Sequence, residues 1–508
     1  MDRKWWTLLV VCVGTFMLLL DITIVNVALP RIASSLKASF SDLQWVVDAY
    51  ALTLAALLLT AGALADLIGR RVVFAVGLVL FALASLLCAL SPTALFLILA
   101  RGGQGIGGAI MFATSLALLA QEFQGRERGT AFAAWGATLG AAVAIGPLVG
   151  GVLTDGLGWP SIFYINVPIG LAAAAVTMTR VPESRDPAGK RIDWIGTVTF
   201  TAALFMLVLA LIRVNALGWG SAEIISLFGG SVLLLAGFTV SQAVQDNAMF
   251  DLTLFRKPAF DGAAIVALTL AASMFAMFLY LTIYLQTILG LSPLQTGLRF
   301  LPITLVMFVV SAVSGRLVGR VSARLPLGAG LALVGAGLLL MRGVTASSHW
   351  TALLAGFIVA GIGIGLVNPA LASSAIAVVP PQRSGMASGI NNTFRQVGLA
   401  TGIAALGAIF ESQLKSKLAP RLAGTPAAGH VSQIAHGVAA GGAQSVIHGV
   451  PSGRRPEAAL AIHAAFASAF NDILLVGGIV ALVGAALALV LVRQRDFAPY
   501  GAAEPVAA

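Results

Sequence analysis

The chain has 508 residues, of which 59% are hydrophobic and only 10% charged, and its mean hydropathy is +0.97. This composition excludes an ordinary soluble protein. Apolar runs of about 20 residues, the length that crosses a bilayer as a helix, recur along almost the whole sequence. We therefore predict an all-α integral membrane protein, since a transmembrane barrel would show short strands of alternating polarity instead.

Fourteen membrane spans are expected. The first begins with a charged head and an apolar core, as a signal peptide does, but no cleavage pattern follows, so it is expected to stay as a span. Cys12 and Cys88 fall within apolar runs, which argues against a disulfide framework or a metal site. The spans are placed at residues 7–29, 43–65, 73–91, 95–119, 129–153, 161–180, 193–213, 223–244, 260–288, 296–318, 326–343, 350–376, 386–411 and 466–492.

Basic residues gather in alternate loops. The chain carries 30 Lys and Arg against 20 Asp and Glu, a net charge of +10, and most of the basic residues fall on the side of the N-terminus. Because Lys and Arg concentrate on the cytoplasmic side of short loops, both termini are predicted to be cytoplasmic, in a plasma or inner membrane. The basic charge therefore orients the spans in the lipid bilayer, and nucleic acid is not an expected partner.

An internal repeat runs through the spans. "GQGIGGAIMF" is followed by "RERGTAFA" and "AGIGIGLVNP" by "QRSGMASG", at the same interval, and "GALADLIGRR" has a weaker echo in "GRLVGRVSAR". A parallel duplication of two six-helix bundles is a transporter architecture, whereas chance likeness of Gly-rich spans is the alternative. The predicted units are 1–185, the N-terminal bundle; 186–257, two inserted spans; 258–495, the C-terminal bundle with a long outer loop at 413–465; and 496–508, a cytoplasmic tail.

Three charged residues are expected at one depth in the membrane. At 1.5 Å per residue, Asp21, Asp48 and Arg101 each lie roughly 8 to 9 Å below the outer surface of the hydrocarbon core. A carboxylate there is costly, but pairing with an always-charged guanidinium makes it tolerable, and the carboxylate can change protonation if the pair rearranges. A fixed ion pair that only holds the spans together is the alternative.

Two further patterns concern helix contacts. Asp66 and Arg70 stand four residues apart at a predicted cytoplasmic helix end, beside Arg71, and this spacing favours local pairing. In the fifth span, small residues allow close helix packing and a proline breaks one backbone hydrogen bond. This packing and hinge element consists of Gly136, Gly140, Gly146, Pro147 and Gly150.

Candidate substrate contacts lie mainly in the ninth span. Met277, Tyr280 and Tyr284 share one helix face, and such adaptable, amphipathic side chains suit a pocket for varied apolar ligands. An aromatic helix packed within the bundle or against lipid is the alternative. Asn26 of the first span is a further candidate.

Arg395 lies within the thirteenth span and needs a partner or a water-filled cavity. Substrate contact and pairing with a group such as Asp472 are both open. The ninth to twelfth spans carry no acidic residue near mid-membrane, which disfavours doubly charged cations as substrates.

Several passages together resemble the fourteen-span drug:proton antiporter branch of the major facilitator superfamily. The passages occur in the expected order: "LDITIVNVALP", "GALADLIGRR", "ARGGQGIGGA", "GATLGAAVAIGPLVGG", "FYINVPIG" and "YLQTILGLSPLQTGLRFLP". The resemblance as a whole extends over nearly all of the chain except the loop at 413–465 and the tail. The resemblance implies the major facilitator fold, two six-helix bundles plus two inserted spans.

The resemblance also implies roles for residues. Asp21 and Arg101 would couple transport to protons, and we add Asp48 as a second titratable partner. The passage with Asp66 and Arg70 would form an inner gate, although Leu67 stands where many relatives carry a basic residue. The span-5 passage would be the antiporter motif, which favours export over uptake: Gly146, Pro147, Gly150 and Gly151.

The function expected is proton-coupled export of hydrophobic or amphipathic small molecules, such as drugs and antibiotics, by alternating access. The alternatives are a dedicated exporter of one endogenous metabolite, lipid or antibiotic, and a non-transporting membrane sensor. An enzyme is not expected, because the sequence shows no convergent His/Cys/carboxylate cluster and no phosphate-binding loop. No cofactor is implied, the proton gradient being the energy source. The expected partners are the substrate, protons and lipid; the oligomeric state is left open, and a monomer is plausible.

Overall fold

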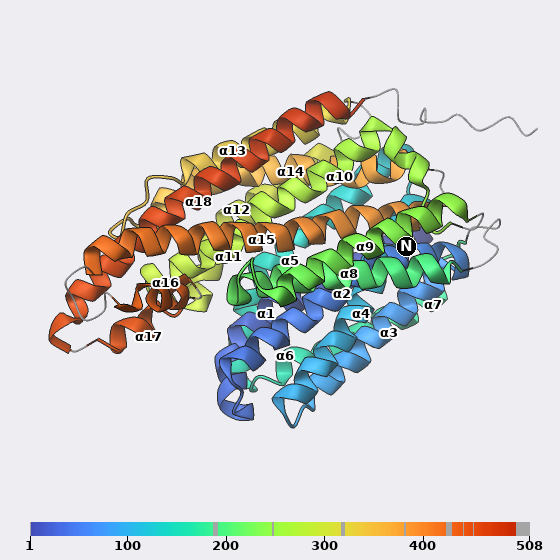
Figure 1. Ribbon diagram of the computed structural model, residues 1–508. Helices are drawn as coiled ribbons and strands as arrows, with labels where there is room; N and C mark the ends of the chain where they lie inside the picture. Colours follow the sequence, from blue (N-terminus) through green and yellow to red (C-terminus); the bar gives the residue numbers. More distant parts are fainter. Residues whose placement is uncertain are drawn as a thin grey trace, which may run out of the picture.

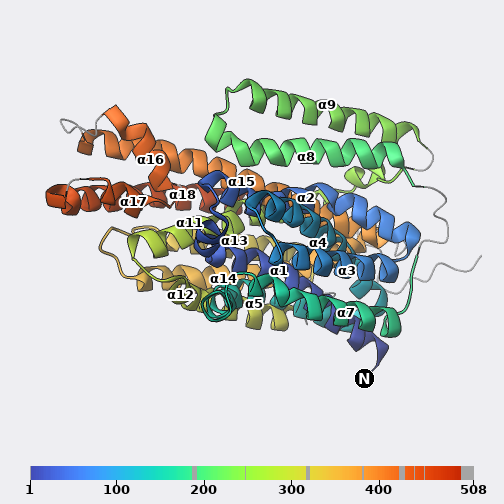
Figure 2. The same ribbon diagram turned by 90° about the horizontal axis from the view of Figure 1, so that it is seen from below.

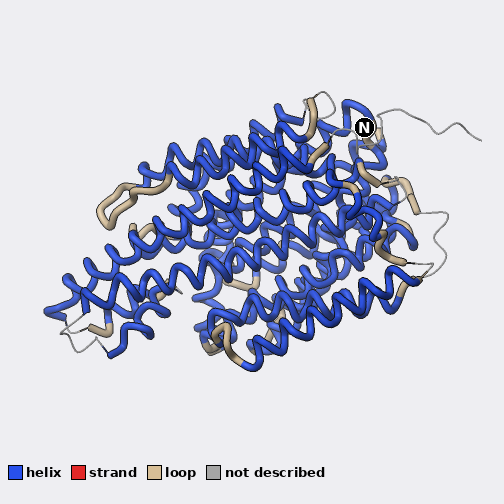
Figure 3. Tube along the Cα trace, turned by 45° about the horizontal axis from the view of Figure 1, so that its top comes forward, coloured by secondary structure: helices blue, strands red, loops and turns tan. Residues whose placement is uncertain are grey.

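Long helices, lying roughly side by side, form the body of the molecule in the computed structural model (Figure 1). The structure describes residues 2–185, 192–245, 248–315, 321–379, 383–422, 429–439, 441–450 and 452–493. Figure 3 shows these helices joined mostly by short loops, with no strand in the ranges given above. The all-α prediction is confirmed.

The helices fall into three groups along the chain. The first group contains α1 (Arg3–Leu36), α2 (Phe40–Ile68), α3 (Arg70–Ala89), α4 (Ala94–Glu122), α5 (Gly125–Gly156), α6 (Ser161–Tyr164) and α7 (Asn166–Arg180). The second is the pair α8 (Trp194–Leu217) and α9 (Ala222–Val244). The third begins with the short 3-10 helix η1 (Leu252–Arg256) and continues through α10 (Pro258–Leu270), the π-helix η2 (Ala271–Phe275), α11 (Ala276–Ile283), the π-helix η3 (Tyr284–Ile288), α12 (Pro293–Ser314), α13 (Arg324–Leu340), η5 (Trp350–Leu353), α14 (Leu354–Ala377), α15 (Ser384–Leu422), α16 (Val431–Ala439), α17 (Ala443–His448), η8 (Ser452–Arg454) and α18 (Arg455–Leu491).

Twelve helices or helix runs of the described chain are long and apolar enough to cross a membrane. Every expected span coincides with a helical segment, but two of these segments are not among the twelve: α13, which has only 17 residues, and α5, which has 32. A multi-pass helical membrane protein is therefore confirmed, whereas the number fourteen stays a prediction.

The glycines of the repeat occupy equivalent positions in the two halves. Gly105 of α4 lies against the backbone of α2, and Gly361 of α14 lies in the same way against α12. Gly107 and Gly363, two residues later, lie against α3 and α13. A Cβ at any of the four positions would collide with a neighbouring backbone, so glycine is required for this close helix packing.

The same repeat relates the contacts between the halves. Gly62 of α2 lies against Gly385 of α15, and Gly315 at the end of α12 lies against Gly129 of α5. Since Gly62 corresponds to Gly315 and Gly129 to Gly385, one contact is formed twice with its partners exchanged. This is the arrangement expected of two parallel repeats that face each other.

Capping boxes start the equivalent helices α2 and α12. Ser39 accepts from the Asp42 N–H and Asp42 accepts from the Ser39 N–H; Ser292 and Gln295 do the same at α12. Each box satisfies two N–H groups that a helix start leaves unpaired. Ser39 and Ser292 are separated by the same interval as Gly62 and Gly315, so the capping box is a further feature that the repeat shares.

Helices α8 and α9 form a peripheral pair beside α2 and α15 (Figure 2). Helix α9 is mostly at the surface, since only 17% of its apolar 18-residue stretch is buried inside the molecule. A buried hydrogen-bond cluster fastens the pair at one end: the Asp193 carboxylate accepts from the Gly196 N–H at 2.7 Å, from Gln242 Nε2 at 2.6 Å and from the Met249 N–H at 3.3 Å. Gln242 Oε1 in turn accepts from the Phe250 N–H at 2.8 Å.

Asp193→Ala should loosen this pair. The substitution removes an N-terminal cap, deprives Gln242 Nε2 of its short hydrogen bond and leaves two backbone N–H groups without their acceptor, so we expect a loss of about 2 kcal/mol in the free energy of unfolding. Thermal unfolding of the purified protein in detergent measures it. Asp155→Ala, at an exposed ion pair with Arg31, is the matched control and should change the Tm little. Equal Tm values for the two variants would contradict the role of Asp193.

Most of the expected outer loop at 413–465 is helical. Helix α15 continues to Leu422 and α18 already starts at Arg455. Between them α16 and α17 pack at the end of the molecule opposite the N-terminus, with Ala435 and Val438 of α16 buried (Figure 1). The two long helices therefore carry a small helical cap.

Candidate functional site

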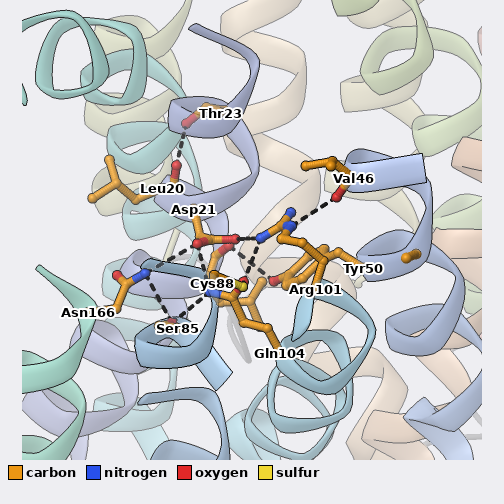
Figure 4. Close-up of polar contacts among 12 residues, drawn as sticks. Leu20, Asp21, Thr23, Val46, Tyr50, Ser85, Cys88, Arg101, Gln104 and Asn166 are labelled. Atoms are coloured by element: carbon orange, nitrogen blue, oxygen red, sulfur yellow. Dashed lines mark hydrogen bonds and ion pairs between the residues drawn. The ribbon is translucent and has the colours of Figure 1, made fainter. Parts of the chain in front are cut away.

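A buried ion pair joins α1 to α4 in the N-terminal half (Figure 4). Asp21 and Arg101 are only 2% and 1% exposed, and Arg101 Nη1 donates to Asp21 Oδ2. The same guanidinium donates from Nε to the Val46 carbonyl oxygen of α2 at 3.0 Å, and its Cζ lies 4.3 Å from the centroid of the Tyr50 ring. One arginine thus links three helices, and its charge is compensated by a carboxylate, a carbonyl dipole and an aromatic face.

Two amide side chains complete the surroundings of the Asp21 carboxylate. Gln104 Nε2 donates to Asp21 Oδ1 at 2.8 Å and to Ser85 Oγ at 2.7 Å, and Asn166 Nδ2 donates to the same Oδ1 at 3.2 Å (Figure 4). Gln104 Oε1 accepts from Arg101 Nη1 at 2.6 Å. The carboxylate is therefore held by α4 and α7, and α3 is joined to the cluster through Ser85.

The structure brings together two of the three charges expected in one layer. Asp48 lies on α2 two residues after Val46 and is partly buried, but its carboxylate has no hydrogen-bond or ion-pair partner in the described part of the chain. Arg101 reaches α2 through the Val46 backbone instead. The role of Asp48 as a second titratable partner stays a prediction.

Gln104 and Asn166 were not predicted as site residues. Both stand in quoted passages, "ARGGQGIGGA" and "FYINVPIG", and both are polar residues within apolar spans. Gln104 also follows Arg101 by one helical turn, so it shares the Arg101 face. These signals would have sufficed to predict Gln104 as a site residue. The contact of Asn166 with Asp21 could not be predicted in this way, because it requires the packing of α7 against α1.

Asp66 links the two halves at the predicted cytoplasmic end. Its Oδ1 accepts from Arg70 Nε at 2.9 Å and Nη2 at 2.8 Å, and both side chains are buried. The two carboxylate oxygens also accept from the Gly385 N–H at 2.9 Å and the Met386 N–H at 2.8 Å, in the first turn of α15. Because a helix start carries unpaired N–H groups and the positive end of the helix dipole, Asp66 of the N-terminal half stabilises and holds a helix of the C-terminal half.

Arg71 belongs to a neighbouring contact within the N-terminal half. Glu183 Oε1 accepts from the Arg71 N–H at 3.0 Å, and Glu183 Oε2 accepts from the Val72 N–H at 3.3 Å and lies 3.6 Å from Arg71 Nε. Arg70 Nη1 donates to Ser184 Oγ at 3.1 Å. Glu183 therefore caps the start of α3 from the segment after α7, a role that sequence reasoning did not predict.

The glycines of α5 pack closely on both halves. Gly136 and Gly140 face α14 and α12, whereas Gly146 and Gly150 face the turn of α1 that follows Asp21. A Cβ at Gly150 would lie 3.3 Å from the Ile24 Cα atom. Helix α5 therefore touches both the partner half and the segment that carries Asp21.

Two members of the proposed antiporter motif contribute differently. In the described part of the chain, no atom beyond the neighbouring backbone of α5 lies within 4 Å of the position that a Cβ would take at Gly151. Helix α5 runs through Pro147 without interruption, and the Pro147 side chain lies outside the described residues. The link between this motif and the direction of transport stays a prediction.

The predicted substrate residues of the ninth span lie in the core of the C-terminal half. Met277 and Tyr284 are fully buried and Tyr280 nearly so. The Tyr280 hydroxyl donates to the Ile403 carbonyl oxygen at 2.9 Å, and the Tyr284 ring stacks on Phe470 with centroids 5.0 Å apart. In this conformation the three side chains pack within the bundle, and their contact with a substrate stays a prediction.

Asn26 and Arg395 are open to their surroundings. Asn26 is exposed on α1, and Arg395 of α15 is partly exposed, with its Cζ 4.9 Å from the centroid of the Phe275 ring. No ion pair joins Arg395 to Asp472 or to any other acidic residue in the described ranges. The pairing with Asp472 that the sequence left open is thus not formed here.

The fold and the site define a multi-pass membrane transporter of small molecules rather than an enzyme. The sequence profile described as "Major Facilitator Superfamily" matches residues 11–403, and the chain belongs to that superfamily. Its transporters move substrates across membranes between two related bundles, which agrees with the repeat and the exchanged contacts above.

Individual comparisons agree with this placement. The chain is 38% identical over 418 residues to the multidrug resistance protein Stp of Mycobacterium tuberculosis, covering 82% of this chain and 78% of that protein. It is 33% identical over 491 residues to the tetracenomycin C resistance and export protein of Streptomyces glaucescens, covering 96% and 91%. Among solved structures, the proton:xylose symporter XylE matches with a TM-score of 0.62 at 13% identity, covering 96% of each chain, which shows the shared fold.

Proposed function

We propose that the chain exports hydrophobic or amphipathic small molecules, drugs and antibiotics among them, in exchange for protons. The substrate class is supported by the two relatives reported above, whose names state multidrug resistance and tetracenomycin C resistance and export. Proton exchange is supported by one observation above all, the carboxylate of Asp21 buried within the membrane-spanning bundle.

The surroundings of Asp21 suit both protonation states. As a carboxylate it accepts from the Arg101 guanidinium and from two amide groups. Gln104 and Asn166 each carry a donor and an acceptor, so a rotated amide can accept from the protonated acid.

Release of the proton requires coupling to the alternation of the halves. Asp21 lies on α1, directly before the turn on which Gly146 and Gly150 of α5 pack, and α5 also contacts α12 and α14 of the C-terminal half. A movement of α5 with that half would therefore reach the neighbourhood of Asp21. The Asp66 contact with α15 would close the cytoplasmic end in one state and release it in the other.

The orientation of the chain in the membrane is part of the same proposal. We place both termini in the cytoplasm of the cell, with the protein in the plasma or inner membrane, because the basic loops lie on the side of the N-terminus. The proposed energy source is the proton gradient.

Asp21→Asn tests the proposal in everted membrane vesicles with an imposed pH gradient. The probes are an anionic, a neutral and a cationic aromatic compound: anthraquinone-2-carboxylate, its methyl ester and ethidium. We expect gradient-driven accumulation of at least one probe by the wild type and a loss of at least about tenfold in the variant, because an amide cannot carry the proton. Asp155→Asn, an exposed carboxylate, is the matched control. Undiminished accumulation by Asp21→Asn at equal protein level would contradict proton coupling through Asp21.

A further inference from the structure

Arg395 is a cation without a counter-charge inside the C-terminal half. Its guanidinium contacts the Phe275 ring, and in the described chain it has no hydrogen-bond acceptor and no acidic partner. The described acidic residues of this half lie elsewhere: Asp261 in the first turn of α10, Glu411 beside His436, Glu457 in the first turn of α18, and Asp472 further along α18. An uncompensated charge inside a membrane protein is costly, and such residues mark substrate or ion sites.

The helix faces of α15 show where Arg395 points. Gly385 and Gly389 face α2 of the N-terminal half, whereas Gly398 and Gly402 face α10 and η2 of the C-terminal half. At about 100° per residue, Arg395 lies about 80° and 120° from the directions of Gly385 and Gly389, but only about 60° and 20° from those of Gly398 and Gly402. Its side chain therefore lies nearer the face of α15 that α10 and η2 cover, beside Phe275.

Unpaired polar groups line the same face of α15. Ser388 and Asn391 precede Arg395 by about two turns and about one turn, are 0% and 6% exposed, and leave Ser388 Oγ and Asn391 Oδ1 without a hydrogen-bond partner. Nearby, Asn392 Nδ2 donates to the Phe112 carbonyl oxygen of α4 at 3.2 Å across the two halves, while its Oδ1 is unpaired. Buried polar groups are nearly always paired, so these groups beside an unpaired guanidinium need partners that the described chain does not supply, and a polar ligand can provide them as water can.

An aromatic row continues from the guanidinium. Phe275 lies 6.2 Å from Phe278, Phe278 lies 5.4 Å from Phe300, and Phe300 lies 5.7 Å from Phe357, all between ring centroids. Phe275 ends the π-helix η2, and π-turns within α-helices occur frequently at functional sites. Phe275 and Phe278 are only partly buried, so their rings are available to a flat apolar ligand.

We propose that Arg395 binds the carboxylate, or an equivalent anionic oxygen, of an aromatic substrate whose rings lie against Phe275 and Phe278. Asn391 Oδ1 accepts from a hydroxyl or N–H group of the same molecule. This inference rests on the proposed export function and narrows its substrate class to aromatic organic acids. The absence of acidic groups around Arg395 in the described C-terminal half agrees with it, because a cationic ligand would find repulsion and no partner there.

An ion pair with Asp48 in another conformation is the competing explanation for the unpaired Arg395 guanidinium. Gly62 of α2 lies against Gly385, and Leu58 and Leu59 lie against Gly389, so the two helices are antiparallel. Continued in this register, Asp48 lies about 6 Å above the level of Arg395. Arg395 could then pair with Asp48 in another conformation and never meet a substrate.

Equilibrium binding to the purified full chain in lipid nanodiscs distinguishes a substrate site at Arg395 from an Arg395–Asp48 ion pair. The probes are 2-naphthoate and anthraquinone-2-carboxylate, each against its methyl ester. We expect the wild type to bind the acids more tightly than the esters, and Arg395→Gln to weaken acid binding by about 10- to 100-fold while ester binding changes less than twofold. Asn391→Leu, which keeps the charge, should weaken binding of a hydroxylated acid, 3-hydroxy-2-naphthoate, more than that of 2-naphthoate. Acids bound no more tightly than their esters by the wild type would overturn the proposal.

Three further variants separate folding and proton coupling from binding. Arg395→Lys keeps the charge and should recover part of the acid binding, whereas recovery of transport by the charge exchange Asp48→Arg with Arg395→Asp would overturn the proposal in favour of the pairing. Asp21→Asn, compared at an equal amount of monodisperse folded protein, should bind the acids as the wild type does and lose only gradient-driven accumulation. Loss of accumulation with binding intact is thus a failure of proton coupling, and loss of the preference for acids is a failure of the Arg395 site.

Discussion

Arg101→Leu is expected to remove most of the folded protein. The substitution leaves the Asp21 carboxylate buried with only two amide donors, and it also removes the hydrogen bond that joins α4 to the Val46 carbonyl of α2. Breaking a buried pair by deleting one partner costs about 3 to 5 kcal/mol, because the remaining charge is uncompensated. The yield of monodisperse protein in detergent and its Tm measure the effect.

A double-mutant cycle identifies the cause. Asp21→Asn combined with Arg101→Leu removes both charges, and the new amide can hydrogen-bond to Gln104 and Asn166, so the double variant should be more stable than Arg101→Leu alone. Arg101→Lys keeps a charge but loses the planar fork that reaches Asp21 and Val46 together, and should fall between. If Asp21→Asn brings no recovery in the Arg101→Leu background, the destabilisation comes from lost packing and not from the charge on Asp21.

The fold was largely predictable because its determinants are local. The length of an apolar run decides whether a helix can cross a membrane, and glycine spacing decides how closely two helices approach. The repeat that was visible in the sequence returned in the structure as contacts formed twice, Gly62 with Gly385 and Gly315 with Gly129. The glycines of the repeat were thus the residues that told most about the fold.

The site was less predictable because the depth of a residue in the membrane does not show which way its side chain points from the helix. A rise of 1.5 Å per residue placed Asp21, Asp48 and Arg101 in one layer, but only the rotation of α2 decides that Val46 and not Asp48 meets the guanidinium. Asn166 reaches Asp21 from α7, more than a hundred residues away in the chain, which no spacing rule announces. Tyr280 and Tyr284 share a face as expected, yet that face is turned toward α15 and α18 in the C-terminal core.

The buried cluster around Asp21 and the Asp66 contact between the halves have different roles in the molecule. Asp21 is bonded only within the N-terminal half, so separation of the halves at the cytoplasmic end does not by itself break its ion pair, and only the proposed movement of α5 would reach it. Asp66 is bonded across the halves, and its hydrogen bonds to α15 must break whenever that end opens. Stability therefore depends chiefly on the first carboxylate and the conformational equilibrium on the second.

Asp66→Ala is accordingly expected to open the predicted cytoplasmic end. It should also lower the Tm, because the buried Arg70 guanidinium loses its carboxylate partner and keeps Ser184 Oγ as an acceptor. The substitution removes two hydrogen bonds to the start of α15 and the favourable charge at its dipole, worth about 2 kcal/mol together. This corresponds to a shift of roughly thirtyfold in the ratio of closed to open molecules. Spin labels at Ile68 of α2 and Leu325 of α13, both exposed at this end, report the distance between the halves by double electron–electron resonance once the two native cysteines are replaced.

Asp251→Ala is the matched control, because Asp251 also forms an ion pair near this end, with Arg383 at 3.1 Å, but both side chains are substantially exposed. Exposed pairs contribute little, so its distance distribution should match the wild type. Asp66→Asn keeps a neutral acceptor for the α15 backbone and should lie between wild type and Asp66→Ala. An unchanged distribution in Asp66→Ala, with a lowered Tm, would show that Asp66 and Arg70 only fasten the end of α2, and that Gly62 against Gly385 holds the halves together by packing alone.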